Sequence, residues 1–145
     1  MAFENGSRTM DGTWGTVWAD GSEVAEISAF QLKVVKNWDT ISMCGQMAED
    51  RKLTGIKITG SMTLPKVYSR GAEDVRAAVQ GHDIRRTLVT KLADPDAYGA
   101  ERVAVYSMNY DKQTLMDFAA GKAGSMTVPF QATGFEYLDE VAPPV

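Results

Sequence analysis

The chain is poor in the side chains that most catalytic and metal sites need, with one cysteine and one histidine in 145 residues. Cys44 has no partner for an intrachain disulfide, and a cysteine-rich metal site cannot be built. His82 alone excludes a two-histidine metal site. It directly follows Gly81 and has no nucleophile motif beside it, so we interpret it as a surface residue just past a helix end. We expect no catalytic site, cofactor site or metal site, and the chain is not expected to be an enzyme.

Long apolar runs and an excess of basic residues are also missing. No stretch approaches the roughly 18 apolar residues of a membrane span, and "MAFENGSRTM" has no basic region followed by an apolar run. Fifteen basic against nineteen acidic residues give a net charge of −4, the wrong sign for gripping phosphates. We expect a soluble protein, intracellular at synthesis, that neither binds nucleic acid tightly nor enters a membrane.

Two motif-like patterns favour structural interpretations. Gly55 and Gly60 have the spacing of a phosphate-binding loop, but Ser61 and Met62 stand where lysine and serine or threonine are required. These glycines are expected to mark a close backbone approach or a bend in a strand.

The segment "DPDAYGAE" resembles a calcium loop through Asp94, Asp96 and Glu101. Tyr98 replaces an oxygen ligand, however, and the closing acid comes too early. A turn is favoured over a metal site.

The three tryptophans pose a similar choice. Trp14, Trp18 and Trp38 could form a stacking platform for nucleotides, but they lack basic neighbours. Packing in the core or at a subunit interface is favoured.

What the chain does contain is alternation. Asp20-Gly21 lies between two runs of β-branched and aromatic residues, which predicts a hairpin within residues 13–36. Its second arm is expected to be long, with Phe30, Leu32 and Val34 on one face. A third strand is predicted from about Trp38 to Met43.

The clearest strand is "GIKITGSMTL", with Ile56, Ile58, Met62 and Leu64 on one face. One helix is predicted over residues 71–80, with a buried stripe of Ala72, Val75, Ala78 and Val79, and with Gly81 in the left-handed position after its end.

Two further strands, "DIRRTLVTKLA" and "ERVAVYSMNY", are expected to form a hairpin across the turn at residues 94–100. The last strand, "GSMTVPFQATGFEYL", contains Pro129, which indicates an edge position or a bulge. We therefore predict a mainly β protein: one β-barrel or sandwich of about seven strands with one flanking helix. Residues 1–12 are expected to be a flexible arm, residues 13–140 the domain and residues 141–145 a flexible tail.

One loop, at roughly residues 45–54, is longer than most hairpin loops and carries both acids and bases with no net charge. It could be a solvated hairpin tip. Alternatively it is a docking element, because methionine adapts to a partner surface and paired charges favour one register.

Several segments in order resemble a known family. They are "WADGSEVAEI", "KVYS" before the helix, "GAERVAVY" at 99–106 and "VPFQATGF" at 128–135. Over residues 12–140 the chain resembles the tail tube proteins of contractile phage tails, in the XkdM-like group typified by the PBSX defective prophage.

The resemblance implies a fold shared with the Hcp tube proteins of type VI secretion. It also implies hexameric rings, joined edge to edge, that stack into a hollow tube conducting DNA without specific binding. The implied partners are further copies of the chain, the tail sheath protein, the tape measure protein and the tail terminator and baseplate proteins. The implied place is the virion tail or a phage-like particle, assembled in the host bacterial cytoplasm.

In this family the long loop reaches toward the adjacent ring. That role falls here on Met43, Gln46, Met47, Glu49, Asp50, Arg51 and Lys52. Met47 is expected to pack against the next ring and the four charged residues to pair across it. The alternatives are a tube protein of a type VI-like or bacteriocin-like injection machine and, less favoured, a small-ligand-binding β-barrel.

Overall fold

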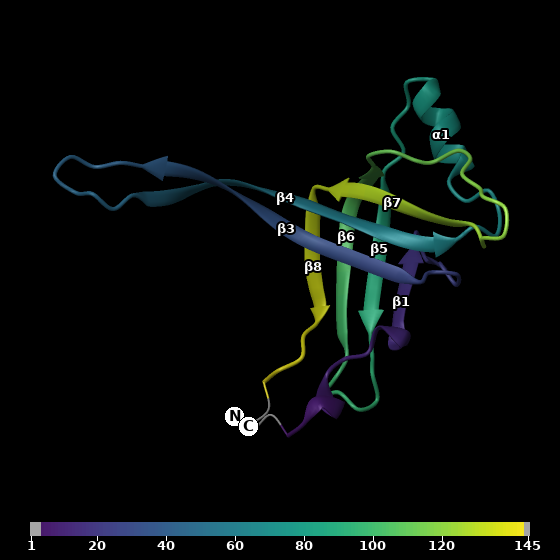
Figure 1. The fold of residues 1–145 in the computed structure, drawn as a ribbon, viewed down its shortest axis with the longest axis horizontal. Helices are drawn as coiled ribbons and strands as arrows, with labels where there is room; N and C mark the ends of the chain where they lie inside the picture. Colours follow the sequence, from purple (N-terminus) through teal and green to yellow (C-terminus); the bar gives the residue numbers. More distant parts are fainter. Residues whose placement is uncertain (1–3, 144–145) are drawn as a thin grey trace.

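The computed structural model describes residues 4–143 and contains two crossed antiparallel sheets (Figure 1). Two 3₁₀ turns, Gly6–Arg8 and Gly12–Trp14, precede the first strand. The elements are β1 (Gly15–Ala19), β2 (Ser22–Glu23), β3 (Ala29–Ile41), β4 (Asp50–Pro65), α1 (Ala72–Val79), β5 (Arg86–Leu92), β6 (Glu101–Tyr110), β7 (Ser125–Ala132) and β8 (Gly134–Asp139). None of the helices in this part of the chain is long and apolar enough to span a bilayer.

Strand β6 belongs to both sheets. Its first part pairs with β5 and β8, whereas Asn109 and Tyr110 pair with β7. Between the two parts Ser107 has a positive φ of 54°, and the β5 register shifts between Arg86 and Leu88. This local bend carries the chain from the sheet β2-β1-β5-β6-β8 into the sheet β6-β7-β4-β3, so that the two sheets face each other.

The core lies between the sheets and takes side chains from both. Phe130, at the centre, is fully buried and stacks on Phe30 with ring centroids 5.8 Å apart. The buried cluster is Val17, Val24, Ile58, Met62, Leu64, Leu88, Val105, Met108, Val128, Phe130 and Ala132. The mainly β prediction with one flanking helix is confirmed.

The hairpin at Asp20-Gly21 is confirmed, since both residues have positive φ and β1 pairs with β2. The predicted length of its second arm is wrong, because β2 has only two residues and residues 24–28 cross to the other sheet. The predicted long arm and third strand are in fact the single strand β3. A bulge opposite Asn37 and Trp38, where Thr54 is the extra residue, lets pairing continue through the break in alternation.

The predicted last strand is two strands in different sheets. β7 pairs with β4, whereas β8 pairs with β6, and Thr133 lies between them. The edge position or bulge predicted at Pro129 is not found, because β7 pairs with both β4 and β6 and its pairing with β4 has no register shift. The proline lies where the pairing with β6 ends: its carbonyl accepts from Asp111 N–H just past the end of β6, and its missing N–H points to the same side, where the sheet loses one hydrogen bond.

Both glycines of β4 have the predicted structural role. A Cβ at Gly60 would lie 2.3 Å from the Gln31 carbonyl oxygen and 2.6 Å from Phe130 Cζ, so β3 and the core ring approach as closely as only glycine permits. Gly55 lies opposite Asn37, at the bulge.

Helix α1 is confirmed within one residue at each end, and Gly81 has the predicted positive φ of 85°. Its buried stripe is wrong. Val79 is 84% exposed, whereas Asp74 is buried, because the helix attaches to the body through an ion pair.

The turn at residues 94–97 is confirmed. The buried Asp94 carboxylate accepts from the backbone N–H groups of Asp11 and Asp96, and its carbonyl accepts from Ala97. Within residues 4–143, no group of three or more histidine, cysteine or acidic residues is placed to hold a metal.

Candidate assembly surfaces

Strands β3 and β4 continue far beyond the body as a two-stranded ribbon (Figure 1). Residues 36–41 pair with residues 50–56, and residues 42–49 connect them at the tip. The predicted loop boundary is therefore corrected: Asp50, Arg51 and Lys52 belong to β4. They pair there with Ile41, Thr40 and Asp39, because a ribbon with both faces in solvent accepts polar residues at every position.

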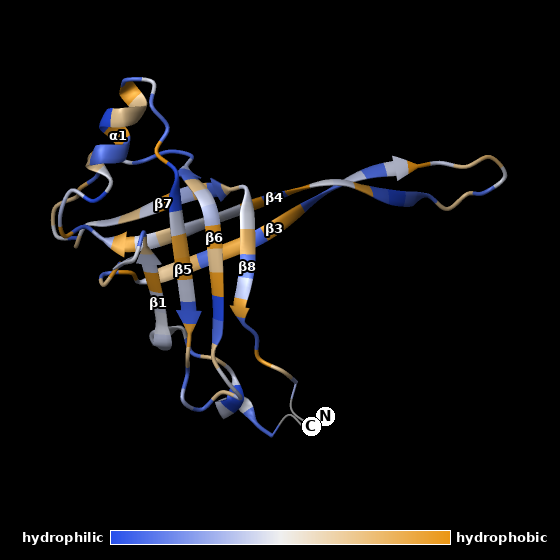
Figure 2. Ribbon diagram, turned by 180° about the vertical axis from the view of Figure 1, so that it is seen from behind, coloured by the Kyte–Doolittle hydropathy of each residue, from blue (hydrophilic) through white to orange (hydrophobic). Residues whose placement is uncertain are grey.

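The ribbon has one apolar face. Cross-strand register places Lys36 beside Ile56, Trp38 beside Leu53, and Thr40 beside Arg51. Trp38, Leu53 and Ile56 are 43%, 48% and 52% exposed, and we call them the apolar ribbon face. This face continues the core-facing side of β3, and Figure 2 shows hydrophobic residues on both strands where they leave the body, followed by mostly hydrophilic positions farther along the ribbon.

A cation packs on the same face. The Arg51 guanidinium lies over the Trp38 ring, 4.3 Å from its centroid, which keeps the indole beside a positive charge. The opposite face carries Asp39 beside Lys52 and Ile41 beside Asp50. The ribbon is thus amphipathic: both of its acidic strand residues lie on the face away from Trp38.

The residues predicted to stack between rings fall in two places. Met43, Gln46, Met47 and Glu49 lie at the tip, where Met47 is fully exposed, and Asp50, Arg51 and Lys52 lie in the paired strand. Their contact with another ring stays a prediction. The apolar ribbon face was missed, because the bulge hides its alternation in the sequence.

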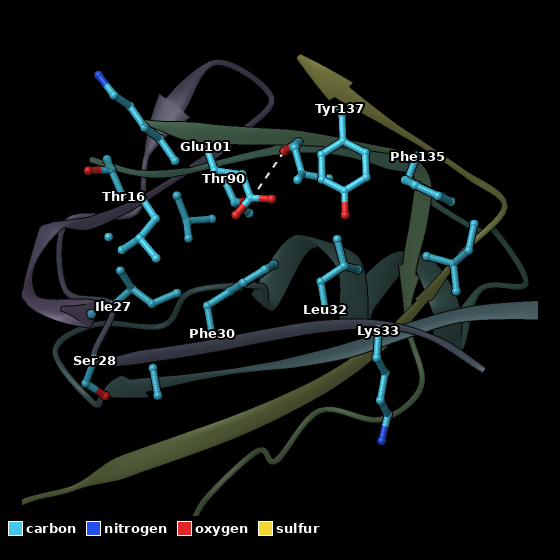
Figure 3. A pocket seen from close by; sticks show the side chains of 18 of the residues that line it. Thr16, Ile27, Ser28, Phe30, Leu32, Lys33, Thr90, Glu101, Phe135 and Tyr137 are labelled. Atoms are coloured by element: carbon cyan, nitrogen blue, oxygen red, sulfur yellow. Dashed lines mark hydrogen bonds between the residues drawn. The ribbon is translucent and has the colours of Figure 1, made fainter. Parts of the chain in front are cut away.

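An open cleft of about 830 Å³ lies beside β3 (Figure 3). One wall is β3, with Phe30 and Leu32, and the other is the inner face of the neighbouring sheet, with Val103, Phe135 and Tyr137. Figure 3 shows Tyr137 pointing across the cleft toward Leu32. Because β3 is the last strand of its sheet, it leaves this part of the other sheet uncovered.

Glu101 lines this mostly apolar cleft and is half-buried. In residues 4–143 it forms no salt bridge. Lys33, although it also lines the cleft, points away from the opposite wall in Figure 3. Lys91 is the other charged lining residue, and its alternation with the buried Leu88 places it on the outer side of β5. Glu101 is therefore the charged group on the inner side of this mostly apolar cleft.

A third exposed surface lies around α1. Val79 on the helix and Leu115, Met116 and Phe118 on the segment between β6 and β7 are all at least 71% exposed. The Gln113 side chain donates to the Gly71 carbonyl, which holds that segment against the start of the helix. We call Leu115, Met116 and Phe118 the helix patch.

Two ion pairs fix α1 and the segment before it to the body. Arg86 on β5 binds Asp74 and also Asp20, and the hydrogen bond that Arg86 donates to the Asp74 carboxylate is the main cause that raises the pKa of this guanidinium. Arg70 donates to Glu26 at 2.5 Å and 3.0 Å, which lowers the pKa of the Glu26 carboxyl. The helix patch is thereby held in one place relative to the sheets.

The tryptophans divide between packing and exposure. Trp18 is half-buried in β1, while Trp14 is 49% exposed and Trp38 lies on the ribbon. Of the two expected roles, packing in the core therefore applies to Trp18 alone, whereas Trp14 and Trp38 are exposed.

Known proteins match nearly the whole chain. The family model described as "Phage tail tube protein" matches residues 2–139. The "Phage-like element PBSX protein XkdM" of Bacillus subtilis (strain 168) is 30% identical over 137 residues, covering 92% of this chain and 93% of that protein. The "Uncharacterized protein YqbM" of the same strain is also 30% identical, over 92% of each chain.

Solved structures share the fold at low identity. The sheath/tube terminator of an extracellular contractile injection system has a TM-score of 0.72 at 6% identity, covering 90% of this chain and 97% of that one. A chain of the sheath-tube complex of that kind of system has a TM-score of 0.64 at 8% identity, over 89% and 90%. Hcp1 from Flavobacterium johnsoniae has a TM-score of 0.51 at 9% identity, over 86% and 94%.

Proposed function

Since the chain belongs to the phage tail tube protein family and is a structural subunit of a tail tube, we propose that it forms hexameric rings that stack into the inner tube of a contractile tail. The observation that carries this proposal is the β3–β4 ribbon. A two-stranded ribbon is marginal alone in water, and this one exposes an apolar face. Such an element gains its stability from a neighbouring copy.

Ring closure is proposed to occur edge to edge. β3 and β8 are outermost strands, and their free edges offer unpaired backbone groups to a neighbour. Subunits with such edges tend to associate. In a monomeric protein this would lead to aggregation, whereas a tube subunit needs it for assembly.

The lumen is proposed to conduct DNA without specific binding. A net charge of −4 keeps the wall from gripping phosphates, so the polymer can slide. The helix patch offers an apolar surface to an outer partner such as the tail sheath protein. Tape measure, terminator and baseplate proteins complete the proposed tail, which is built in the host bacterial cytoplasm. In this proposal the subunit has no catalytic role.

The ribbon tip is proposed to bridge stacked rings, with Met47 against the next ring and the charges at Glu49, Asp50, Arg51 and Lys52 paired across the joint. The test is Met47→Asp combined with Asp50→Lys, imaged by negative-stain electron microscopy. Rings without tubes are expected. The control is Lys122→Asp, an exposed charge change in the segment before β7 that should leave tubes intact. Normal tubes from the double variant would show that the tip is not the stacking element.

The rival functions differ in simple measurements. A small-ligand-binding β-barrel predicts a monomer on size exclusion that gains thermal stability with a metabolite, whereas a tube subunit predicts ring or tube particles. A phage tail and a bacteriocin-like or type VI-like machine use the same tube. Genes for a capsid and a terminase beside this one would indicate a phage or phage-like particle, which the similarity to the PBSX protein XkdM of B. subtilis favours.

A further inference from the structure

We infer that the cleft beside β3 receives the apolar ribbon face of another copy. The inference deepens the proposed tube function and rests on it. It assigns a receptor to the ribbon: Trp38, Leu53 and Ile56 of one copy lie against Val103, Phe135 and Tyr137 of the next. Neither surface is covered by other residues within 4–143. Both expose large apolar side chains, and the exposure of such side chains to water is unfavourable.

The fold leaves room for one more layer of strand at this place. The sheet containing β3 stops at that strand, while the opposite sheet continues below it, so the inner face of the opposite sheet is uncovered there. A ribbon entering beside β3 would lay its apolar face on this uncovered inner face and bury it. Such packing by side chains leaves the free backbone edge of β3 to the neighbour in the proposed ring. The occupant is therefore expected to be a strand, and the ribbon is an unpartnered pair of strands.

The charged residues favour one orientation of the ribbon. Glu101 lies on the inner side of the cleft and forms no salt bridge within residues 4–143, whereas Lys33 and Lys91 line the cleft from strand faces directed away from it. The apolar ribbon face is flanked by two charged residues, Lys36 and Arg51, both cationic, while Asp39 and Asp50 lie on the other face. Burying the apolar face thus brings a cation toward Glu101 and keeps the acids away from it. The reverse orientation would place Asp39 or Asp50 against the same carboxylate, which is repulsive.

The ribbon of the same copy cannot fill the cleft. It runs straight out of the body in both Figure 1 and Figure 2, and the cleft ends at Val34, where the ribbon begins. At roughly 3.3 Å per residue, the six paired residues from Lys36 to Ile41 reach about 20 Å beyond the body. That length reaches a neighbouring copy, so the occupant is a second molecule.

The test is cross-linking between two kinds of copy. In a Cys44→Ser background, a Leu53→Cys subunit is mixed with a differently sized Tyr137→Cys subunit, assembled, and treated with a short bis-maleimide. The expected product is a heterodimer in high yield. Leu53→Cys mixed with Val79→Cys, at the exposed end of α1, is the control and should give at least tenfold less. Thr90→Cys, at a second position in the cleft, is tested in the same way, in case the sulfur at residue 137 is poorly placed for the cross-linker.

Charge reversal gives an independent readout. Glu101→Arg is expected to slow assembly at least tenfold, and Arg51→Glu added to it should restore much of the rate. Normal tubes that show neither the cross-links nor an effect of Glu101→Arg overturn the cleft as receptor and leave the tube function standing. If the unmodified chain forms neither rings nor tubes, the proposed function itself fails.

Discussion

The guanidinium of Arg86 on β5 binds the carboxylate of Asp74 on α1, with Arg86 Nε 2.9 Å from Asp74 Oδ2. Asp74 is 8% exposed, and its side chain is the inward anchor of a helix whose apolar Val79 faces solvent. The only helix of more than three residues in the described chain is thus attached by charge more than by apolar packing.

Asp74→Asn should lower the free energy of unfolding by about 3 kcal/mol, because it leaves the partly buried Arg86 short of a countercharge. Urea unfolding of the free subunit measures the loss. Asp83→Asn is the matched control: it breaks the Arg85–Asp83 pair, whose side chains are about half exposed, and should cost less than about 0.5 kcal/mol. Equal effects of the two variants would contradict the anchoring role.

Acid should weaken the Glu26–Arg70 contact. The hydrogen bond from Arg70 holds the pKa of Glu26 below its usual 4.5, so its stabilising contribution is complete above that pH and is lost as pH falls through the lowered pKa. Stability measured by urea unfolding at pH 7 and near pH 3 should therefore fall more in the unmodified chain than in Glu26→Gln. Glu23→Gln, which removes an exposed carboxylate from β2, serves as the control for charge alone. A Glu26→Gln variant with the same acid sensitivity as the unmodified chain refutes the claim.

Gly60→Ala should destabilise the subunit by about 3 kcal/mol, because its Cβ would overlap the Gln31 carbonyl and the Phe130 ring. Gly55→Ala is the comparison: its Cβ would lie 3.6 Å from the Asn37 side chain, an ordinary contact. Thermal unfolding should show a large loss at residue 60 and a change under about 1 kcal/mol at residue 55. Similar losses at both positions would mean that strand β4 disfavours any side chain there.

Two isoleucines of β4 should separate folding from assembly. Ile58 is 4% exposed in the core, and Ile58→Ala should cost about 3 kcal/mol of stability. Ile56, two residues earlier on the apolar ribbon face, is 52% exposed, so Ile56→Ala should barely change unfolding while slowing tube formation. Light scattering during assembly and urea unfolding provide the two readouts. Normal assembly by Ile56→Ala would remove that residue from the interface.

Hydrogen exchange should report the ribbon's partner directly. In the free subunit, backbone amides of residues 38–41 and 50–53 are expected to exchange quickly, because two strands alone open easily. Amides of residues 60–64, where β4 lies between β3 and β7, should exchange slowly. Assembly should slow exchange in the ribbon. Full protection of the ribbon before assembly would contradict its dependence on a neighbour.

Local patterns predicted most of the elements. Asp20-Gly21 marks its hairpin because the turn needs positive φ at both residues, and alternation in β4 identifies Ile58, Met62 and Leu64 as core. The errors occur where pairing partners far apart in the sequence decide the outcome. Ile56 alternates like a core residue, yet β4 has left the body there, and no local signal gives that length.

The sequence predicted where the assembly surface lies but not which residues form its apolar face. Composition and loop length indicate the segment around Met47, whereas Trp38 and Leu53 meet only through a register that depends on the bulge at Asn37. Likewise β7 and β8 read as one strand, because the switch at Thr133 is caused by β6 offering edges in two sheets. The cleft depends on where β3 ends the shorter sheet, which is a property of the whole topology.

The ribbon leaves the body at one end only (Figure 1). Copies joined through it are oriented head to tail, so the two extremities of an assembly are chemically unlike: one presents unfilled ribbons and the other presents vacant receptors. Where such a joint does not close into a ring, growth through it is directional and has no intrinsic stopping point. In the proposed tube, the length and the two unlike ends would then be set by other proteins.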